Sequence, residues 1–297
     1  MPLTDLQWSY RDLVFGEGTN YHINWVDGFE GFDARTSDSD NPRGDGAIRG
    51  VDYVAPRTIG FELAMIEVDG DIESDDYETM WVNVRNAFLP SRSLDHELTF
   101  KRPGMPERMI RCRPVQLNRK ETYRQYNAVG FPPVVLRAVD PRIYSTATRS
   151  VLLQPYSASG GGVDLPNDLP INFGAGSQIE VNADNDGSAD AYPLVRFYGP
   201  ISGTVTGVTL TNVTTGQVLE ISATITTGQI LTADMTAAVT GSNQLVVSLD
   251  GSSRYGDWEL PREAFALAPG SNTLRFEVTG TSTDAQCLVQ WRDTWLG

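Results

Sequence analysis

The segment LEISATIT at residues 219–226 decides the fold class of the second half of this chain. Apolar Leu219, Ile221, Ala223 and Ile225 alternate with polar side chains. Successive side chains of an extended strand point to opposite faces, so one row enters a core while the other meets water. The segment therefore predicts a half-buried β-strand.

The same period of two recurs along the second half, at residues 231–235, 274–278 and 287–291. Turn-forming sequences separate these runs, at residues 212–216, 227–228, 241–243 and 269–272. We find no helical pattern there. Short strands at regular spacing with turn signals between them predict an antiparallel β-sandwich.

The first half is mixed, and one of its segments is predicted to be a helix over about 74–89. Ser74 is a plausible N-cap, and Asp75 and Asp76 would face the positive end of the helix. Apolar residues then recur at helical spacing up to Pro90, namely Tyr77, Met80, Trp81, Val84 and Phe88.

Strand patterns surround this helix. Phe61, Leu63 and Met65 alternate, and residues 133–139 read as a buried strand. Residues 98–110 predict two strands around a Pro103–Gly104 turn. The first half is therefore expected to be one helix packed on a sheet or barrel.

Composition changes near residue 150, which predicts two domains. A Ser-, Gly- and Pro-rich stretch begins at Ser157, and Lys is absent from the second half. We expect a first domain at 1–150, a linker at 151–170 and a second domain at 171–297.

The charge argues against general nucleic-acid binding. The 297 residues carry a net charge of -15, from 23 basic and 38 acidic side chains. Residues 1–150 hold 18 basic and 23 acidic residues, which leaves 5 and 15 in the second half. Cationic side chains drive binding to phosphates, and acidic residues outnumber basic ones in both halves, so neither half is suited to bind nucleic acid. No segment has the roughly 20 apolar residues that cross a bilayer, and the N-terminus lacks a signal-peptide pattern, so we expect a soluble protein without membrane insertion.

No recognisable catalytic motif is present. Neither His22 nor His96 lies in a catalytic motif, and the sequence has no nucleophile elbow or glycine-rich phosphate loop. Cys112 and Cys287 lie far apart and are interpreted as buried small apolar residues. We therefore predict no enzyme activity, no cofactor, and no catalytic or metal site.

One loop leaves a metal interpretation open. Residues 182–190 place oxygen-bearing side chains and Gly187 at calcium-loop spacing, but Pro193 stands where a bidentate Glu is required. A polar hairpin turn is the favoured alternative. The acidic run Glu67–Glu78 is interpreted as a solvated loop or as the lining of a passage that repels a polyanion. The tripeptide Arg43–Asp45 and the sequon at Asn212 carry no conclusion.

Several segments together resemble the distal tail proteins of siphophages, of the type found in phages that infect actinobacteria. In the second half these are residues 191–200 after Asn-Asp-Gly, 211–216, 267–276 and 289–295. In the first half they are residues 42–47 and 50–53, Arg57 and residues 140–144. The resemblance covers nearly the whole chain.

The resemblance implies a fold and a role. The fold would be mainly β, with a split β-barrel of the tail-tube type followed by a galectin-like antiparallel β-sandwich. The role would be a structural virion protein whose homohexameric ring joins the tail tube to the tail tip or baseplate and leaves a lumen for DNA. The implied partners are further copies, the tail tube protein, a tail tip or hub protein and the tape-measure protein, with assembly in the host cytoplasm. We expect the hairpin at 98–110 to contact a neighbouring subunit or the tube.

Two other classes of function remain open. A carbohydrate- or receptor-binding module of a tail fibre or tip would need exposed aromatic platforms, for which Tyr255, Trp258, Trp291 and Trp295 are the candidates, although alternation places Trp291 in the core. A glycoside hydrolase would need two carboxylates at a fixed separation in a cleft.

Overall fold

The computed structural model describes residues 2–29, 31–66, 74–92, 94–119, 132–156, 180–242, 244–281 and 284–296. The chain forms two compact units. Unit 1 comprises residues 1–146 and 295–297, and unit 2 comprises residues 147–294.

Unit 1 is a β structure with one long helix. Its elements are β1 (Gln7–Tyr10), β2 (Leu13–Gly16), β3 (Tyr21–Asp27), β4 (Ala34–Arg35), β5 (Ser39–Asp40), β6 (Ala47–Ile48), β7 (Tyr53–Val54), β8 (Arg57–Met65), α1 (Ser74–Ala87), β9 (His96–Phe100), β10 (Arg108–Leu117), β11 (Pro133–Ala138) and β12 (Ile143–Ser145).

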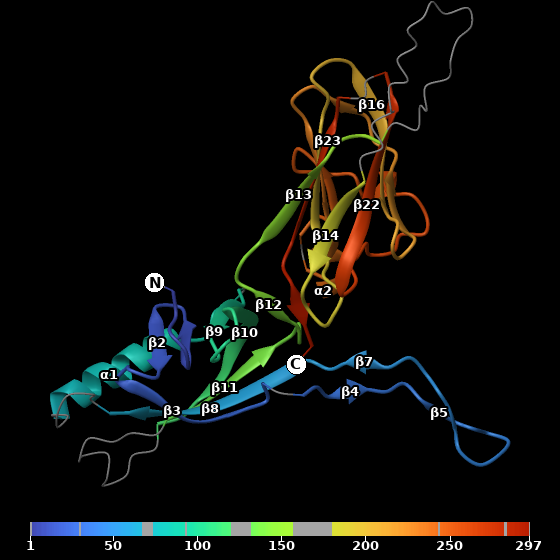
Figure 1. The fold of residues 1–297 in the computed structure, drawn as a ribbon. Coiled ribbons are helices and arrows are strands. Elements are labelled where there is room, and N and C mark those ends of the chain that lie inside the picture. Colours follow the sequence, from blue (N-terminus) through green and yellow to red (C-terminus); the bar gives the residue numbers. More distant parts are fainter. Residues whose placement is uncertain are drawn as a thin grey trace, which may run out of the picture. The chain divides into compact units, whose positions relative to one another are not determined.

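A curled antiparallel sheet with the order β2-β1-β9-β10-β11-β8-β3 forms the body of unit 1, and β12 pairs with β10 (Figure 1). The three predicted strand regions lie within it, and Phe61, Leu63 and Met65 are fully buried. Alternation along these strands directs one row of side chains to the core and the other to the opposite face.

Helix α1 covers the core face of this sheet. The predicted apolar stripe packs into the same cluster as the buried strand residues, and Phe88 lies 5.1 Å from the ring of Tyr10. The helix ends at Ala87, two residues before the predicted end. The side chains of the predicted cap, residues 74–76, and most of the acidic run lie outside the described side chains.

Unit 2 contains most of the remaining strands. Its elements are β13 (Arg149–Leu153), β14 (Val181–Asn185), β15 (Leu194–Tyr198), β16 (Thr204–Asn212), β17 (Gln217–Ile221), β18 (Ile225–Thr226), β19 (Ile230–Asp234), α2 (Met235–Thr240), β20 (Val247–Leu249), β21 (Ser252–Ser253), η2 (Tyr255–Asp257), β22 (Gly270–Gly280) and β23 (Gln286–Trp291). The last strand of the chain is β24 (Thr294–Trp295), at the boundary between the units.

Two antiparallel sheets face each other across one core in unit 2. Their orders are β13-β23-β15-β19-β20-β21 and β14-β22-β16-β17, with β18 beside β16. Leu219, Ile221, Ala223 and Ile225 are all buried in this core, which confirms the strand that the opening segment predicts.

The sequence missed a short helix in this unit. Met235 continues the alternation of β19, but it begins α2 instead. The carboxylate of Asp234 accepts hydrogen bonds from the Thr236 and Ala237 amides, and Gly241 ends the helix at φ 63°. Both are ordinary capping devices, which outweigh a strand pattern of only three residues.

The observed unit boundaries also differ from the predicted ones. The predicted boundary places residues 149–153 in the first domain and the linker. In the structure they form β13, which pairs with β23 in unit 2. Residues 295–297 belong to unit 1 rather than to the second domain. The rest of the predicted linker, from residue 157 on, lies outside the described residues. Among the described residues, no helix is long and apolar enough to span a membrane.

Candidate assembly interface

The most exposed part of unit 1 is a long ribbon between β3 and β8, which we call the arm (residues 32–56). β4 pairs with β7, and β5 pairs with β6, so the arm is two short ladders in series (Figure 1). Every residue from Gly31 to Arg49 is exposed. The sequence pattern does not predict this extended ribbon.

Large apolar side chains of the arm face solvent. Phe32 is 65% exposed, Ile48 57%, Val51 62% and Tyr53 56%. An isolated two-stranded ribbon is marginally stable in water, and grouped exposed apolar side chains mark sites of interaction. The arm therefore has the properties of a segment that is covered by a partner.

Local contacts give the arm a defined shape. The Ser37 hydroxyl donates to the Val51 carbonyl at 2.8 Å, and the Gly50 amide donates to the Asp38 carboxylate at 2.8 Å. A Cβ at Gly50 would lie 2.2 Å from the Ser37 carbonyl oxygen, so only glycine permits this approach. At the tip, the Arg43 amide donates to the Asn41 side chain at 3.1 Å.

The root of the arm is held by Arg57, the first residue of β8. This side chain is 7% exposed, and its guanidinium donates to the carbonyls of Phe29 at 2.6 Å, Pro141 at 3.2 Å and Leu296 at 3.4 Å. Burial lowers the pKa of Arg57, and the Asp33 carboxylate opposes that shift. One cation thus ties the arm, the segment before β12 and the C-terminal residues together.

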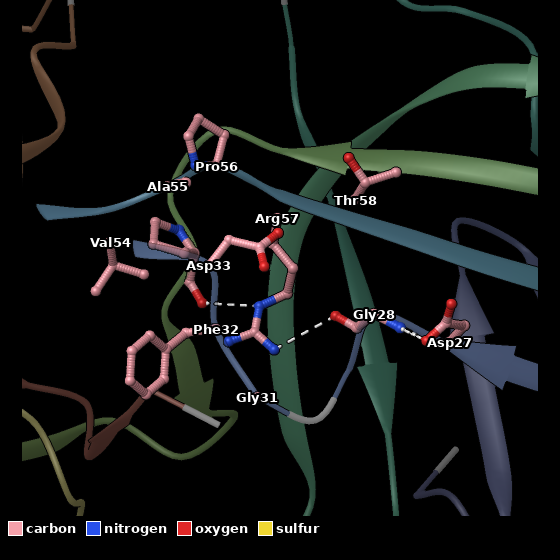
Figure 2. Close-up of a pocket in the computed structure, with 11 residues that line it drawn as sticks. Asp27, Gly28, Gly31, Phe32, Asp33, Val54, Ala55, Pro56, Arg57 and Thr58 are labelled. Carbon is pink, nitrogen blue, oxygen red and sulfur yellow. Dashed lines mark hydrogen bonds between the residues drawn. The ribbon is translucent and has the colours of Figure 1, made fainter. Parts of the chain in front are cut away.

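Beside Arg57 lies a polar cavity of about 290 Å³ (Figure 2). Its lining includes Asp27, Asp33, Arg57 and Pro141. The Asp27 carboxylate accepts the Gly28 amide at 2.7 Å. The contacts of Arg57 are to backbone carbonyls, which indicates a structural role at the root of the arm.

The predicted interface hairpin at 98–110 is not a free element. β9 and β10 are central in the sheet, with β1 and β11 as their outer neighbours, and Leu98 and Ile110 are fully buried. Only the turn is exposed, at residues 103–106. Because both strands have their backbone groups paired on both sides, the arm offers more unsatisfied surface than this hairpin.

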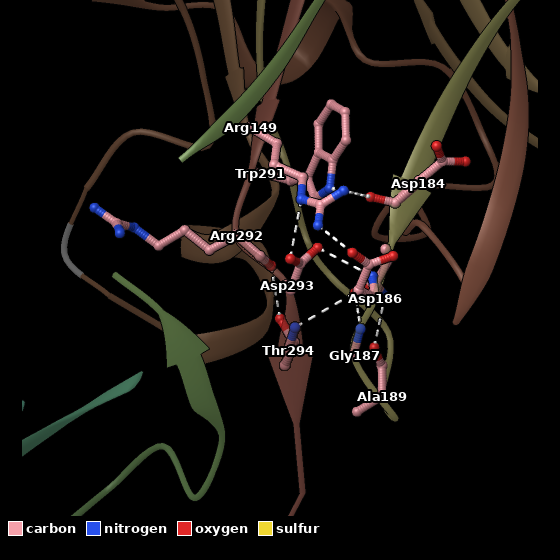
Figure 3. A network of polar contacts seen from close by, with 10 residues as sticks. Arg149, Asp184, Asp186, Gly187, Ala189, Trp291, Arg292, Asp293 and Thr294 are labelled. Atoms are coloured by element: carbon pink, nitrogen blue, oxygen red, sulfur yellow. Dashed lines mark hydrogen bonds and ion pairs between the residues drawn. The ribbon is translucent and has the colours of Figure 1, made fainter. Parts of the chain in front are cut away.

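The candidate calcium loop in unit 2 is occupied by an arginine. The Arg149 guanidinium forms ion pairs with Asp186 and, at 3.0 Å, with Asp293, and it donates to the Asp184 carbonyl at 3.4 Å (Figure 3). Desolvation lowers the pKa of Arg149, but the two carboxylates outweigh it and raise the pKa above its ordinary value. Across the described ranges, no group of three or more His, Cys, Asp or Glu could hold a metal ion.

The turn interpretation of this loop fits its geometry. The Asn185 side chain accepts the Gly187 amide at 3.1 Å, which is the bond of an Asx-type turn. Gly187 is required by packing rather than by a positive φ, because a Cβ there would lie 2.0 Å from the Thr294 carbonyl oxygen.

Three buried asparagines explain other segments that carried the family resemblance. Asn185, Asn212 and Asn272 are at most 1% exposed. The Asn212 amide donates to the Asn272 side chain at 2.9 Å and to the Ala266 carbonyl at 3.1 Å. Asn272 in turn accepts the Ala268 amide at 2.9 Å. These motif residues fasten loops to strands, and the burial of Asn212 excludes the sequon as an accessible glycosylation site.

Both thiols and two of the four aromatic candidates are buried. Cys112 and Cys287 are free and fully buried, as predicted, and desolvation raises the pKa of both thiols. Trp258 and Trp291 are 3% and 5% exposed, so they are not platforms for a ligand. His22 lies on β3 opposite Ala64, and His96 lies on β9 opposite Cys112.

The remaining candidate platforms are Tyr255 and Trp295. Tyr255 is 47% exposed, with the Arg262 guanidinium 5.0 Å from its ring centroid. Trp295 belongs to unit 1, where the Arg108 guanidinium lies 3.9 Å from its ring centroid.

Comparison with known proteins finds a family model that matches part of the chain and solved structures that share its fold. Residues 186–295 match the family model described as the C-terminal domain of a siphovirus-type tail component, SPP1 Dit. No curated protein sequence matches the chain. The crystal structure of the SPP1 Dit protein, described as a paradigm of the hub adsorption apparatus in phages that infect Gram-positive bacteria, matches with a TM-score of 0.61 and 11% identity. That match covers 96% of this chain and 98% of the Dit chain.

A chain of the phage P2 baseplate, in its activated conformation with Ca, matches with a TM-score of 0.51 and 10% identity. It covers 96% of this chain and 97% of that chain. Together these matches confirm the resemblance to siphophage distal tail proteins and the mainly β fold predicted from it.

Proposed function

We propose that this chain is a structural protein of the distal end of a long non-contractile phage tail. Its copies form a ring, expected to be a hexamer, that joins the tail tube to the tail tip or baseplate and leaves a lumen for DNA. The observation that carries the proposal is the family match over residues 186–295, together with the Dit fold over 96% of the chain.

The arm supplies the physical reason for self-association. It exposes Phe32, Ile48, Val51 and Tyr53, and within the described residues no further strand pairs with the backbone groups on the outer edges of its short ladders. A partner that covers this surface gains hydrophobic burial and pairs those groups. Repetition of one such contact around an axis closes a ring when the rotation allows it.

The charge of the chain is compatible with a DNA passage. A net charge of -15 disfavours stable binding of a polyanion, and a lumen of like charge repels the polymer that passes through it. We therefore propose no stable nucleic-acid binding and no catalytic role. The remaining partners of the proposal are the tail tube protein, a tail tip or hub protein and the tape-measure protein. The assembled ring would reside in the tail tip of the virion after assembly in the host cytoplasm.

We also propose that the sandwich of unit 2 is of the galectin-like type, without a glycan site. The alternative function, a carbohydrate-binding module, has weaker support because Trp258 and Trp291 are buried. Binding of the purified chain to a glycan array, with loss of the signal in Tyr255→Ala, would favour that alternative.

The direct test is the mass and shape of the purified full chain. Native mass spectrometry and negative-stain microscopy are expected to show closed rings of six copies with a central opening. If the chain is a monomer at every protein concentration, up to the concentration used in a tail assembly reaction, the proposal is contradicted.

A further inference from the structure

Five Asp–Gly dipeptides occur in the chain, and one of them lies at the root of the arm. They are Asp27–Gly28, Asp45–Gly46, Asp69–Gly70, Asp186–Gly187 and Asp250–Gly251. In such a pair the glycine nitrogen can attack the aspartate carboxyl group with little hindrance, because glycine carries no side chain. Asp69–Gly70 lies outside the described residues, and the structure allows the other four pairs to be compared.

At Asp27–Gly28 the two reacting groups are already in contact. The Gly28 amide donates to the Asp27 carboxylate at 2.7 Å, as the dashed line between them in Figure 2 shows. The carboxyl carbon is bonded to the accepting oxygen, so nitrogen and carbon lie close to the ~3–3.5 Å separation of a near-attack arrangement. Asp27 is exposed, and among the described residues it forms no ion pair that would hold its carboxylate elsewhere.

The surroundings of this pair favour the reaction. Both residues line the polar cavity of about 290 Å³ beside Arg57, which leaves room for a ring and for the water that later opens it. The fold also requires the glycine, because Gly28 has a φ of 78° and a Cβ there would lie 1.9 Å from the Thr58 carbonyl oxygen. The packing that excludes any other residue at this position thus maintains the reactive pair.

Two of the other described pairs have their reacting groups engaged elsewhere. The Asp186 carboxylate forms an ion pair with Arg149, and the amide of the glycine that follows donates to the Asn185 side chain at 3.1 Å. The Asp250 carboxylate accepts the Ile230 amide at 3.0 Å. These contacts hold nitrogen and carboxyl carbon apart, so the folded structure is expected to protect both pairs.

We propose that Asp27 is a site of spontaneous backbone modification, at which aspartate converts to isoaspartate through a succinimide ring. The Gly28 nitrogen forms a bond to the side-chain carboxyl carbon, and the amide hydrogen leaves with the carboxyl hydroxyl as one water molecule. Water then opens the ring. Opening at the side-chain carbonyl restores aspartate, whereas opening at the main-chain carbonyl leaves the chain running through the side chain. The product has the mass of the starting chain, and no oxidant or reductant takes part.

The modification acts on the anchorage of the arm. Isoaspartate lengthens the main chain by one methylene group just before Gly28, whose carbonyl accepts the Arg57 guanidinium at 3.4 Å. The carbonyl of Phe29, next along the chain, accepts the same guanidinium at 2.6 Å. The insertion shifts both acceptors, so the converted chain holds the root of the arm less firmly. The inference goes beyond the proposed function, because it concerns one chain and does not depend on a ring.

The test is peptide mapping by mass spectrometry of the purified full chain, after incubation at mildly acidic pH, where part of the carboxyl groups are neutral and can lose water. We expect Asp27 to convert roughly tenfold or more faster than Asp186, because a misplacement of reacting atoms by ~1 Å can cost about 10²-fold in rate. The ring intermediate is lighter than the parent peptide by one water. Isoaspartate is recognised because it resists a protease that cleaves before aspartate.

Three controls separate the fold from the local sequence. In urea the folded geometry is lost, so Asp27 and Asp186 are expected to convert at similar rates. The variant Asp27→Glu keeps the charge but places the carboxyl group one methylene farther along the side chain, and we expect no conversion there. The variant Asp27→Asn should close the same ring with loss of ammonia, so that water opens it to a peptide of the parent mass.

Each outcome decides the proposal. Faster conversion at Asp27 in the folded chain, with the preference lost in urea and the signal absent from Asp27→Glu, would support it. Conversion no faster than at Asp186 would overturn it. A preference that persists in urea would overturn it too, since the local sequence rather than the fold would then be the cause. None of these results bears on whether the chain forms rings, so the proposed function stands or falls separately.

Discussion

The arm of unit 1 and the sandwich of unit 2 place their apolar residues in opposite environments. In the sandwich, the alternating apolar rows of β17 and β22 meet in one core, and Leu219 and Phe276 are fully buried. In the arm, Val51 and Tyr53 are more than half exposed. The sandwich thus buries its own hydrophobic surface, whereas the arm leaves apolar side chains exposed. This difference is what the assembly role that we propose for the arm would produce.

The largest effect on folding is expected in the sandwich core. Phe276 packs 5.6 Å from the ring of Phe197, and truncation of a buried Phe leaves a cavity. Phe276→Ala should lower the free energy of unfolding by about 3–5 kcal/mol. Calorimetry of the full chain measures this, with the exposed Val218→Ala on β17 as the control. Equal melting temperatures for the two variants would contradict a self-sufficient core.

A smaller loss of stability is expected at the buried asparagines. Asn272→Ala removes the acceptor of the Asn212 side-chain amide, which is buried, and of the Ala268 amide, which is partly buried. We expect a loss of about 2–3 kcal/mol in the free energy of unfolding, because unpaired buried donors retain their desolvation cost. Urea denaturation checks this. A loss below that of the control Thr273→Ala, a half-buried neighbour on β22, would show that the asparagine network contributes nothing.

The arm should give the reverse result, with an effect on assembly but not on folding. Ile48→Ser with Val51→Ser is expected to change the free energy of unfolding by less than about 0.5 kcal/mol, since both side chains are exposed. The same variant should weaken ring formation, because it removes apolar area that a partner would cover. Val213→Ser with Val218→Ser, exposed on the sandwich, is the matched control. Similar behaviour of the two pairs would remove the distinction between arm and sandwich.

The smallest effect is expected at the surface ion pair between Glu78 of α1 and Arg119, which follows β10. Arg119 holds Glu78 through a hydrogen-bonded ion pair and thereby lowers the pKa of that carboxyl. Because the pKa is lowered in the folded state, the pair adds to the free energy of unfolding at pH values above the unfolded-state pKa of about 4.3. This contribution is lost as the pH falls through the folded-state pKa. Glu78→Gln should therefore melt slightly below the parent at pH 7 and together with it at pH 2. A difference that persists at pH 2 would assign the effect to packing.

The sequence predicted the elements whose two faces meet different environments. Strands β17, β19, β22 and β23 alternate because one face is buried and the other wet, and α1 shows its stripe for the same reason. The arm has no such contrast, since all sides of residues 31–49 face solvent, and its Gly, Pro and Asp content is typical of a loop. β13 was missed because RSVLL ends in an apolar run without alternation, next to a linker-like sequence.

The contacts of the candidate site were beyond sequence reasoning because they join distant positions. Arg149 meets Asp186 and Asp293 only after β13, β14 and β23 have assembled. Two signals were nevertheless present. Asp234 and Gly241 were available as caps of α2, and the arm sequence places Asp40 and Asp45 close to the apolar Ile48.

One measurement addresses most directly whether the arm is the assembling segment. Residues 33–55 are replaced by a short Gly-Ser linker, which the structure permits because the paired Ala34 and Val54 bring the two ends of the arm together. Light scattering on the eluted variant then gives its mass. Our account predicts a folded single copy with the melting temperature of the parent, whereas closed rings of unchanged mass would contradict it.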